Sequence, residues 1–176
     1  MKIHIILICI LVVSCSSISN RSGYLDDSGN PISKYDQIFS RVNAIFAGNC
    51  PSPIIVKQND KPQSEFRVRR STILLGTNAL GKREEMVLAH ETTHLCLAQI
   101  TKGTSNLERF RFFDEGFASI VGGNFSSEYR NRALSVASKK ARKGEVSFAL
   151  VQKWSKYFGD PPNADYEAYE VGASFI

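Results

Sequence analysis

The spacing of hydrophobic and polar positions changes along the chain and predicts a mixed set of elements. Apolar residues recur at helical spacing between residues 35 and 47, which indicates an amphipathic helix. Short β-branched or alternating runs at 53–57 and 66–75 predict two or three strands. Further helices are expected at 84–99, 114–121, 127–143 and 147–158. The fold class is therefore α+β, with a small β-sheet followed by a mainly helical part.

The predicted helix at 84–99 differs from the others because it has no wholly polar face. Its apolar residues surround it and are typical of a helix that is buried on most sides. Three ionisable residues nevertheless lie inside it, namely His90, Glu91 and His94. Burying such groups costs free energy unless a cation or a partner compensates them. Together they spell His-Glu-Thr-Thr-His, which is the HExxH pattern.

The spacing of this motif suits a metal site. Histidines four residues apart lie on one face of a helix, so both imidazoles can bind one zinc ion. The intervening Glu91 can then reach a metal-bound water and act as the general base. A satisfied core histidine is the usual alternative for one such residue. Two histidines and a carboxylate in one apolar helix favour zinc binding instead.

The third zinc ligand has to be a carboxylate. Of the three histidines, His4 falls in a segment that we expect to be removed, so only His90 and His94 remain. Zinc sites that catalyse hydrolysis use three protein ligands and keep one position open. Cys96 is two residues past His94, about 200° round the helix, and so points away from that face.

Four downstream carboxylates come near enough in sequence to be considered. We prefer Glu115, because Gly116 and Ala118 are small and would let its helix approach the histidine-bearing helix closely. Asp114 fits a solvated acid at a helix start better. The full set of candidates is Glu108, Asp114, Glu115 and Glu128.

The HExxH motif followed by Glu115-Gly-x-Ala resembles the peptidase MA-like gluzincins, kin to the aminopeptidase N and thermolysin groups. The resemblance covers roughly residues 70–176 and implies a zincin-like fold. It implies that His90, His94 and Glu115 are the zinc ligands and that Glu91 is the catalytic base. It also implies that the strand at 72–75 binds extended substrate backbone.

The resemblance extends to residues 168–175, which look like the last helix of the family. That helix often begins near a tyrosine and continues further, so the domain could be truncated at its C-terminus. With no histidine to spare, the donor to a developing oxyanion must be a Tyr, an Arg, an Asn or a backbone group. We expect Tyr169 in this role; the alternatives are a core aromatic and Tyr166, one helical turn earlier.

The first residues predict export and a lipid anchor. The apolar run at 5–13 has the length of a signal-peptide core and is too short to span a bilayer. It ends in Val-Val-Ser-Cys15, which resembles a bacterial lipobox. We therefore expect a lipoprotein signal peptide at 1–14, lipid on Cys15 and a location in the bacterial cell envelope, facing the periplasm or the exterior. An ordinary secretory signal that is cut nearby is the alternative.

Polar composition and the remaining cysteines complete the predicted organisation. Residues 15–33 are rich in Ser, Asn, Asp and Gly, so a flexible tether is expected before a folded domain at 34–176. Cys50 and Cys96 are left after the signal and the anchor. An exported pair invites a disulfide, and two separate buried thiols are the alternative.

The charge pattern excludes nucleic acid as an expected partner. The net charge is +5 and the basic residues are scattered, apart from a run at 139–143 that we expect on a solvated helix face. In an exported protein this charge supports at most weak attraction to anionic lipid or to a cell-wall polymer. Nothing in the sequence indicates the oligomeric state.

The expected function is that of a membrane-anchored zinc metallopeptidase acting on a peptide or protein substrate. Hydrolysis of another amide in the envelope is a second enzymatic hypothesis. A zinc-stabilised binding or assembly lipoprotein with little or no hydrolytic activity is the alternative from a different class. Glu91 favours an enzyme, because a structural zinc site needs no water-activating carboxylate between its ligands.

Overall fold

The computed structural model describes residues 22–123, 126–147, 149, 153–159 and 165–176. The described α-helices are α1 (Asp36–Ile45), α2 (Glu84–Ile100), α3 (Arg111–Gly122), α4 (Ser127–Arg142), α6 (Trp154–Phe158) and α7 (Ala168–Ala173). Short 3-10 turns connect them at Ser33–Tyr35, Val68–Arg70, Thr77–Ala79, Gly81–Arg83, Thr104–Asn106 and Glu108–Phe110. The predicted α+β class, with a small sheet and a mainly helical remainder, is confirmed.

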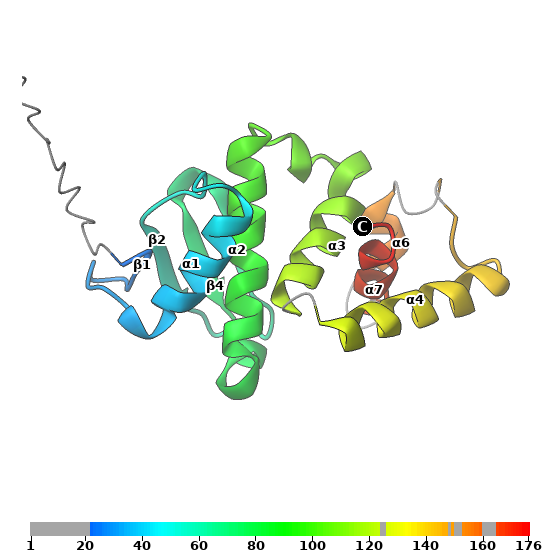
Figure 1. The fold of residues 1–176 in the computed structure, drawn as a ribbon, viewed down its shortest axis with the longest axis horizontal. Coiled ribbons are helices and arrows are strands. Elements are labelled where there is room, and N and C mark those ends of the chain that lie inside the picture. The colour runs from blue at the N-terminus through cyan, green and yellow to red at the C-terminus, as the bar shows by residue number, and fades with distance from the viewer. Residues whose placement is uncertain (1–21, 124–125, 148, 150–152, 160–164) are drawn as a thin grey trace, which may run out of the picture.

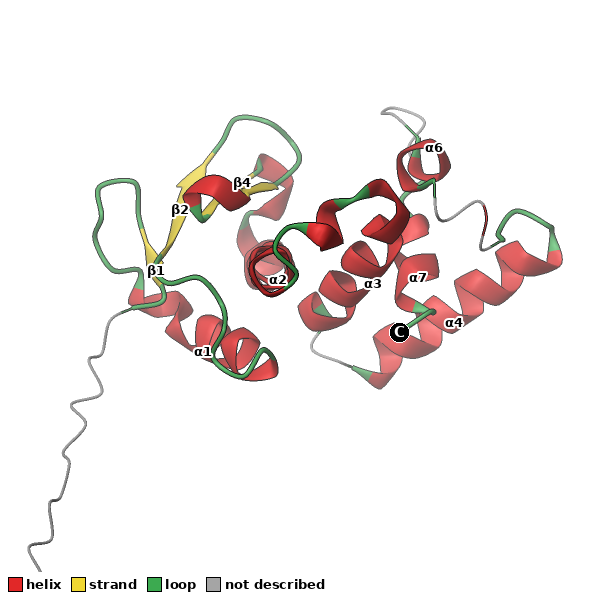
Figure 2. Ribbon diagram, turned by 90° about the horizontal axis from the view of Figure 1, so that it is seen from above, coloured by secondary structure: helices red, strands yellow, loops and turns green. Residues whose placement is uncertain are grey.

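Helix α2 stands between two packed groups of elements (Figures 1 and 2). The sheet and α1 lie on one side of it, and α3, α4, α6 and α7 lie on the other. Its buried residues Leu88, Leu95 and Cys96 belong to the core that α1 and the sheet also share. The prediction of a helix buried on most sides is therefore confirmed. Part of the expected helix at 147–158 falls on residues outside the described ranges.

The sheet has four strands in the order β1-β2-β4-β3. The strands are β1 (Tyr24–Leu25), β2 (Ile54–Gln58), β3 (Glu65–Arg67) and β4 (Thr72–Leu75). β2 is parallel to both β1 and β4, and β3 is antiparallel to β4. Because β4 pairs on both sides, it has no free backbone edge for a substrate. The expectation for residues 72–75 is corrected: β3 is the edge strand on this side of the sheet.

The expected tether at 15–33 is too long, because residues 22–33 belong to the folded domain. Tyr24 is fully buried, and its phenol shares a 2.6 Å hydrogen bond with the hydroxyl of Thr92 on α2. The hydroxyl of Ser22 also donates to Asp36 at 2.6 Å. A single aromatic residue in a polar segment thus fixes it to the core, which composition alone does not reveal. Cys15 and the expected signal peptide at 1–14 lie outside the described residues.

A disulfide joins Cys50 to Cys96 across 46 residues of sequence. It links the loop before β2 to the C-terminal half of α2, two residues past His94. A bridge that closes a loop of this size typically stabilises a fold by about 2–4 kcal/mol. It therefore holds α2 against the sheet side of the domain.

Glycines allow α3 to approach two neighbouring helices. A Cβ on Gly116 would overlap the backbone of Gly172 in α7, and a Cβ on Gly172 would lie 2.7 Å from the carbonyl oxygen of Phe112. The close approach to α2 occurs instead at Gly122, where a Cβ would lie 3.0 Å from the Met86 carbonyl oxygen. Gly116 therefore faces α7 and not α2, which corrects the reason for which we preferred Glu115.

The basic run near the end of α4 does not lie wholly in solvent. Lys140 is 8% exposed, and its ammonium donates to Asp165 at 2.6 Å and lies 3.3 Å from Glu167. Its neighbours in the run are exposed. The expected solvated face therefore holds for those neighbours, whereas Lys140 ties α4 to the residues before α7.

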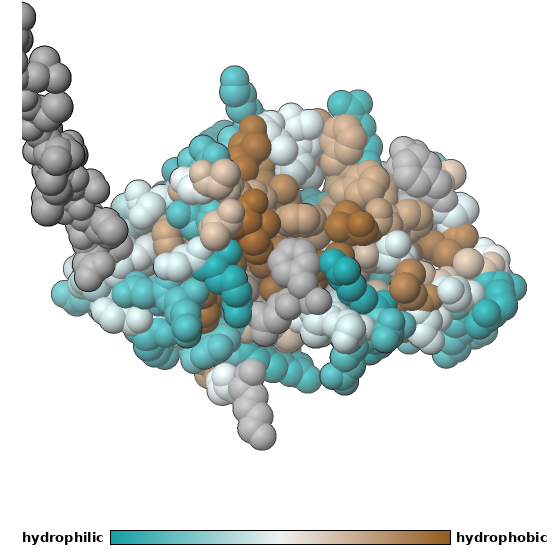
Figure 3. All heavy atoms as spheres, in the orientation of Figure 1, coloured by the Kyte–Doolittle hydropathy of each residue, from teal (hydrophilic) through white to brown (hydrophobic). Residues whose placement is uncertain are grey.

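Apolar side chains reach the surface where the end of α2 lies beside the start of α3 (Figure 3). A groove of about 360 Å³ lies there, and it shares no lining residue with the cavity that contains the two histidines. None of the helices in the described ranges combines the length and the apolar character needed to cross a membrane. The exposed apolar residues that line the groove are Phe110, Phe113 and Ile176.

Candidate metal centre

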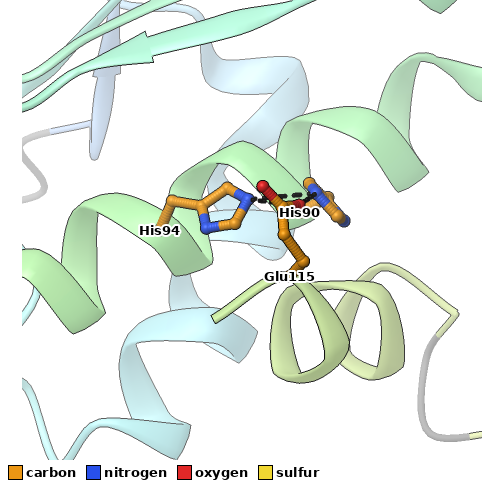
Figure 4. A group of neighbouring side chains, drawn as sticks. All are labelled: His90, His94 and Glu115. Atoms are coloured by element: carbon orange, nitrogen blue, oxygen red, sulfur yellow. Dashed lines mark hydrogen bonds and ion pairs between the residues drawn. The ribbon is translucent and has the colours of Figure 1, made fainter. Parts of the chain in front are cut away.

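Two adjacent turns of α2 and the first half of α3 bring three side chains together (Figure 4). His90 and His94 lie one turn apart on the same face of α2, and their Nε2 atoms are 3.1 Å apart. Oε2 of Glu115 lies 3.3 Å from each of these nitrogens. The preferred carboxylate and the two motif histidines therefore meet at one point.

The dimensions of this triangle fit a metal ion. Ligand atoms about 2.0–2.1 Å from a tetrahedral zinc ion lie about 3.3 Å from one another, which is close to the three distances here. The side chains are 18%, 2% and 5% exposed for His90, His94 and Glu115, so little water competes for them. His90, His94 and Glu115 form a group that could hold a metal ion.

Asp114, which was considered as a ligand and then assigned to a solvated helix start, lies at the site beside His94. Its carboxylate is fully buried, and Oδ2 lies 2.8 Å from Nδ1 of His94. This 2.8 Å ion pair between two buried side chains places a carboxylate where it favours a proton on Nδ1. With the proton on Nδ1, the lone pair of Nε2 faces Glu115 and His90. The expectation of a solvated helix-start acid is therefore wrong for Asp114.

Arg111 is a second residue that was missed. Its Nη2 lies 2.6 Å from Oε1 of Glu115, and its Nη1 lies 3.3 Å from Oδ2 of Asp114. The guanidinium also lies 5.4 Å from the ring centre of Phe66 in β3. Its spacing of three and four residues from the two carboxylates on one helix is a signal that could have identified it.

Phe66 joins the edge strand to the metal centre. Its ring stacks on the imidazole of His94, with ring centres 4.5 Å apart and planes 20° apart. It also lies beneath the guanidinium of Arg111. The β3 strand is therefore fixed against the site by an aromatic side chain, and the sequence had assigned no role to this residue.

The positive charge of His94 and the negative charge of Glu115 stabilise each other strongly. Burial alone would lower the pKa of His94, but Glu115 and Asp114 outweigh it and raise that pKa to about 10. Burial would raise the pKa of Glu115, but His94, His90 and Arg111 hold it well below its usual range. In the metal-free site a protonated His94 therefore faces an ionised Glu115.

Glu91 lines the same cavity as the three candidate ligands. The cavity has a volume of about 260 Å³, and Glu91 is 8% exposed. Burial raises the pKa of its carboxyl more than the nearby His90 and His94 lower it. A carboxyl with a raised pKa exchanges its proton closer to neutral pH, which suits a general base. The lining residues are Ser64, Glu65, Phe66, His90, Glu91, His94, Arg111, Glu115 and Tyr169.

Of the two tyrosines considered, Tyr169 lies at the site. Its ring centre is 6.0 Å from that of His90, and it packs against Trp154 and Phe158. Burial first, and then Glu115 and Glu91, raise its pKa, so it stays a phenol that can donate a hydrogen bond. Tyr166 is 55% exposed, does not line the cavity and accepts a hydrogen bond from Gln63.

The other candidate ligands lie elsewhere. Glu108 accepts hydrogen bonds from the backbone N–H and the hydroxyl of Ser155. Glu128 is exposed in the first turn of α4. Cys96 is part of the disulfide. None of these three lines the cavity that contains His90 and His94.

Comparisons with protein-family models, with curated proteins and with solved structures gave no match to this chain.

Proposed function

We propose that this protein is a zinc-dependent peptidase of the gluzincin type, anchored in the bacterial cell envelope by a lipid on Cys15. The observation that carries the proposal is the position of Glu91 in the same cavity as the triangle formed by His90, His94 and Glu115. A purely structural metal site needs no buried carboxylate of this kind. The arrangement supports hydrolysis rather than metal storage.

The ligand set favours zinc. Two imidazole nitrogens and one carboxylate oxygen are donors that zinc accepts, and their separations fit tetrahedral coordination with one position left for water or substrate. A zinc ion held there would activate water near neutral pH and polarise the substrate carbonyl. The protein residues have to supply proton transfer and hydrogen bonding.

Glu91 and Tyr169 are placed for these two tasks. The buried carboxylate of Glu91 would take a proton as water attacks the carbonyl carbon and would pass it to the leaving amine. The phenol of Tyr169 would donate a hydrogen bond to the carbonyl oxygen as its negative charge develops. Its raised pKa keeps that proton in place throughout. Both side chains line the cavity of the candidate ligands.

The edge strand β3 supports a peptide as substrate. Within the described part of the chain, β3 pairs only with β4, so its other edge is free for hydrogen bonds with an extended backbone. Ser64, Glu65 and Phe66 also line the cavity. A peptide added to this edge would run past His90 and His94 and bring a carbonyl group to the metal position.

The proposal is tested by digesting a peptide library with the protein, with and without a chelator. We expect cleavage that the chelator abolishes and that zinc restores. Glu91→Gln should keep its zinc and lose activity by about 10²-fold or more, as expected for the loss of a general base. Glu85→Gln is the matched control, because Glu85 is an exposed residue of the same helix. Cleavage that persists in Glu91→Gln would refute the mechanism.

A further inference from the structure

We infer that Arg111 is a positioning residue that restrains two of the three metal ligands at once, and so sets the affinity and coordination number of the site. This inference rests on the metal centre of the proposed function. It concerns a residue that lines the cavity but whose recorded ion pairs run to the carboxylates beside the metal position. Its contacts run to Glu115 directly and to His94 through Asp114.

The two oxygens of Glu115 have separate partners. Oε2 faces both histidine nitrogens at 3.3 Å, whereas Oε1 lies 2.6 Å from Nη2 of Arg111. An ion pair of this length holds Oε1 towards Arg111 and away from the metal position. Glu115 would therefore offer a metal ion one oxygen and leave a position for a further ligand. Without Arg111 the carboxylate is free to turn and bind through both oxygens.

Asp114 extends the restraint to the second ligand. Its Oδ2 lies 3.3 Å from Nη1 of Arg111 and 2.8 Å from Nδ1 of His94. A carboxylate in this position orients the imidazole and fixes its tautomer. The guanidinium holds this oxygen between itself and His94, so that one cation controls the direction of both an oxygen ligand and a nitrogen ligand.

Packing keeps the guanidinium in place. The ring of Phe66 lies 5.4 Å from the guanidinium and stacks on His94 at 4.5 Å, so it confines both partners of Asp114. Asp114 and Glu115 are both buried, and Arg111 supplies a positive charge beside each. A neutral residue at 111 would leave both carboxylates with the metal as their remaining counter-charge, which favours extra oxygen ligands at the ion.

Replacing Arg111 by lysine tests whether the planar shape of the guanidinium matters in addition to its charge. A guanidinium is a planar fork that reaches two carboxylates in fixed directions, whereas an ammonium is a point charge that keeps the sign but not the fork. Arg111→Lys should therefore retain more of the metal affinity than Arg111→Gln does, without restoring the coordination geometry. Arg109→Gln is the control, because Arg109 is exposed on the 3-10 turn before α3.

The experiment is a titration of the metal-free protein with Co²⁺, followed by visible absorption. Wild type and Arg109→Gln should show the intense bands of four-coordinate cobalt. Arg111→Gln should bind Co²⁺ about 10- to 100-fold more weakly, the scale of a lost outer contact. Its bands should also weaken as the coordination number rises, and Arg111→Lys should show weakened bands with intermediate affinity. Circular dichroism checks that each variant is folded, and if Arg111→Gln does not fold, Arg111→Lys decides.

Unchanged affinity and an unchanged spectrum in a folded Arg111 variant would overturn the inference. The same holds if Arg111→Lys restores both affinity and spectrum fully, since charge alone would then suffice. A wild-type protein that gives no cobalt spectrum at all would refute the metal centre itself, and with it the proposed function. The two failures are therefore distinguishable.

Discussion

Raising the pH should strengthen metal binding and weaken the metal-free fold, because both effects depend on the proton of His94. In the metal-free site Asp114 faces Nδ1 of His94 and Glu115 faces Nε2, and together they raise the pKa of His94 to about 10. The proton that a metal ion has to displace is the one on Nε2. Only a neutral imidazole can bind a metal ion, so the ion has to displace the proton. Metal affinity and proton affinity therefore compete at the same nitrogen.

The size of the competition follows from the pKa. At pH 7 a pKa of about 10 lies about three units above the pH, which corresponds to a cost on the order of 4 kcal/mol, or about 10³-fold in apparent affinity. Each pH unit lowers this free-energy cost by about 1.4 kcal/mol, which is a factor of ten in apparent affinity. The apparent dissociation constant for zinc should therefore decrease about tenfold from pH 6.5 to 7.5 and again towards pH 8.5.

The stability of the metal-free protein should fall as the pH rises. A histidine whose pKa is raised on folding stabilises the fold fully below its unfolded pKa of about 6.5 and loses that contribution as the pH rises. The loss should be complete near the folded pKa of about 10, and it amounts to a free energy on the order of 5 kcal/mol. The thermal midpoint of metal-free protein should fall over this range, whereas zinc should rescue it.

Calorimetric zinc titrations in two buffers of different ionisation enthalpy count the protons released. We expect about one proton per zinc at pH 7. Burial also raises the pKa of Glu91, so Glu91→Gln separates any proton that comes from that carboxyl. Asp114→Asn should shift the pH dependence to lower pH, because it removes one of the two carboxylates that hold the proton on His94. Zinc binding without proton release and with pH-independent affinity would refute this reasoning.

Three further substitutions test other parts of the structure. Tyr169→Phe should keep zinc and the fold while kcat falls by roughly 10²-fold or more, whereas Tyr166→Phe, at an exposed position, should not change kcat. A Tyr169→Phe variant with the kcat of wild type would show that Tyr169 has only a packing role. Gly116→Ala should destabilise the protein by about 1–3 kcal/mol in urea unfolding, because its Cβ meets the backbone of Gly172, and wild-type stability would contradict that contact. Cys15→Ala should release the protein from the membrane fraction or block its processing, which mass spectrometry of the mature N-terminus decides; an unaltered lipidated product would exclude Cys15 as the anchor.

The parts of the site that the sequence predicted are those that depend on one helix. His90, Glu91 and His94 take their relative positions from helical geometry alone, so their spacing was sufficient. Glu115 was identified from the residues around it, although Gly116 turned out to face α7. Local pattern and a short motif thus selected the carboxylate that meets both histidines, for a reason that was only partly right.

The parts that were missed depend on contacts between elements. The burial of Asp114 requires α3 to present its first turn to α2, and no local pattern indicates which side of a helix start faces inwards. The edge position of β3 depends on pairing with a strand that follows it in sequence. Tyr24 is one aromatic residue in a polar segment, and only the surrounding core shows that it is buried.

The proton on His94 and a bound metal ion are alternative cations at the same contact between the two halves of the domain. His94 belongs to α2, which packs on the sheet, whereas Asp114 and Glu115 belong to α3 on the other side. Near neutral pH a protonated His94 attracts both carboxylates, so α2 and α3 remain joined without metal. Metal therefore exchanges with a proton in a site that is already assembled. The fold should consequently outlast removal of the metal at neutral pH and come to depend on it only in alkaline solution.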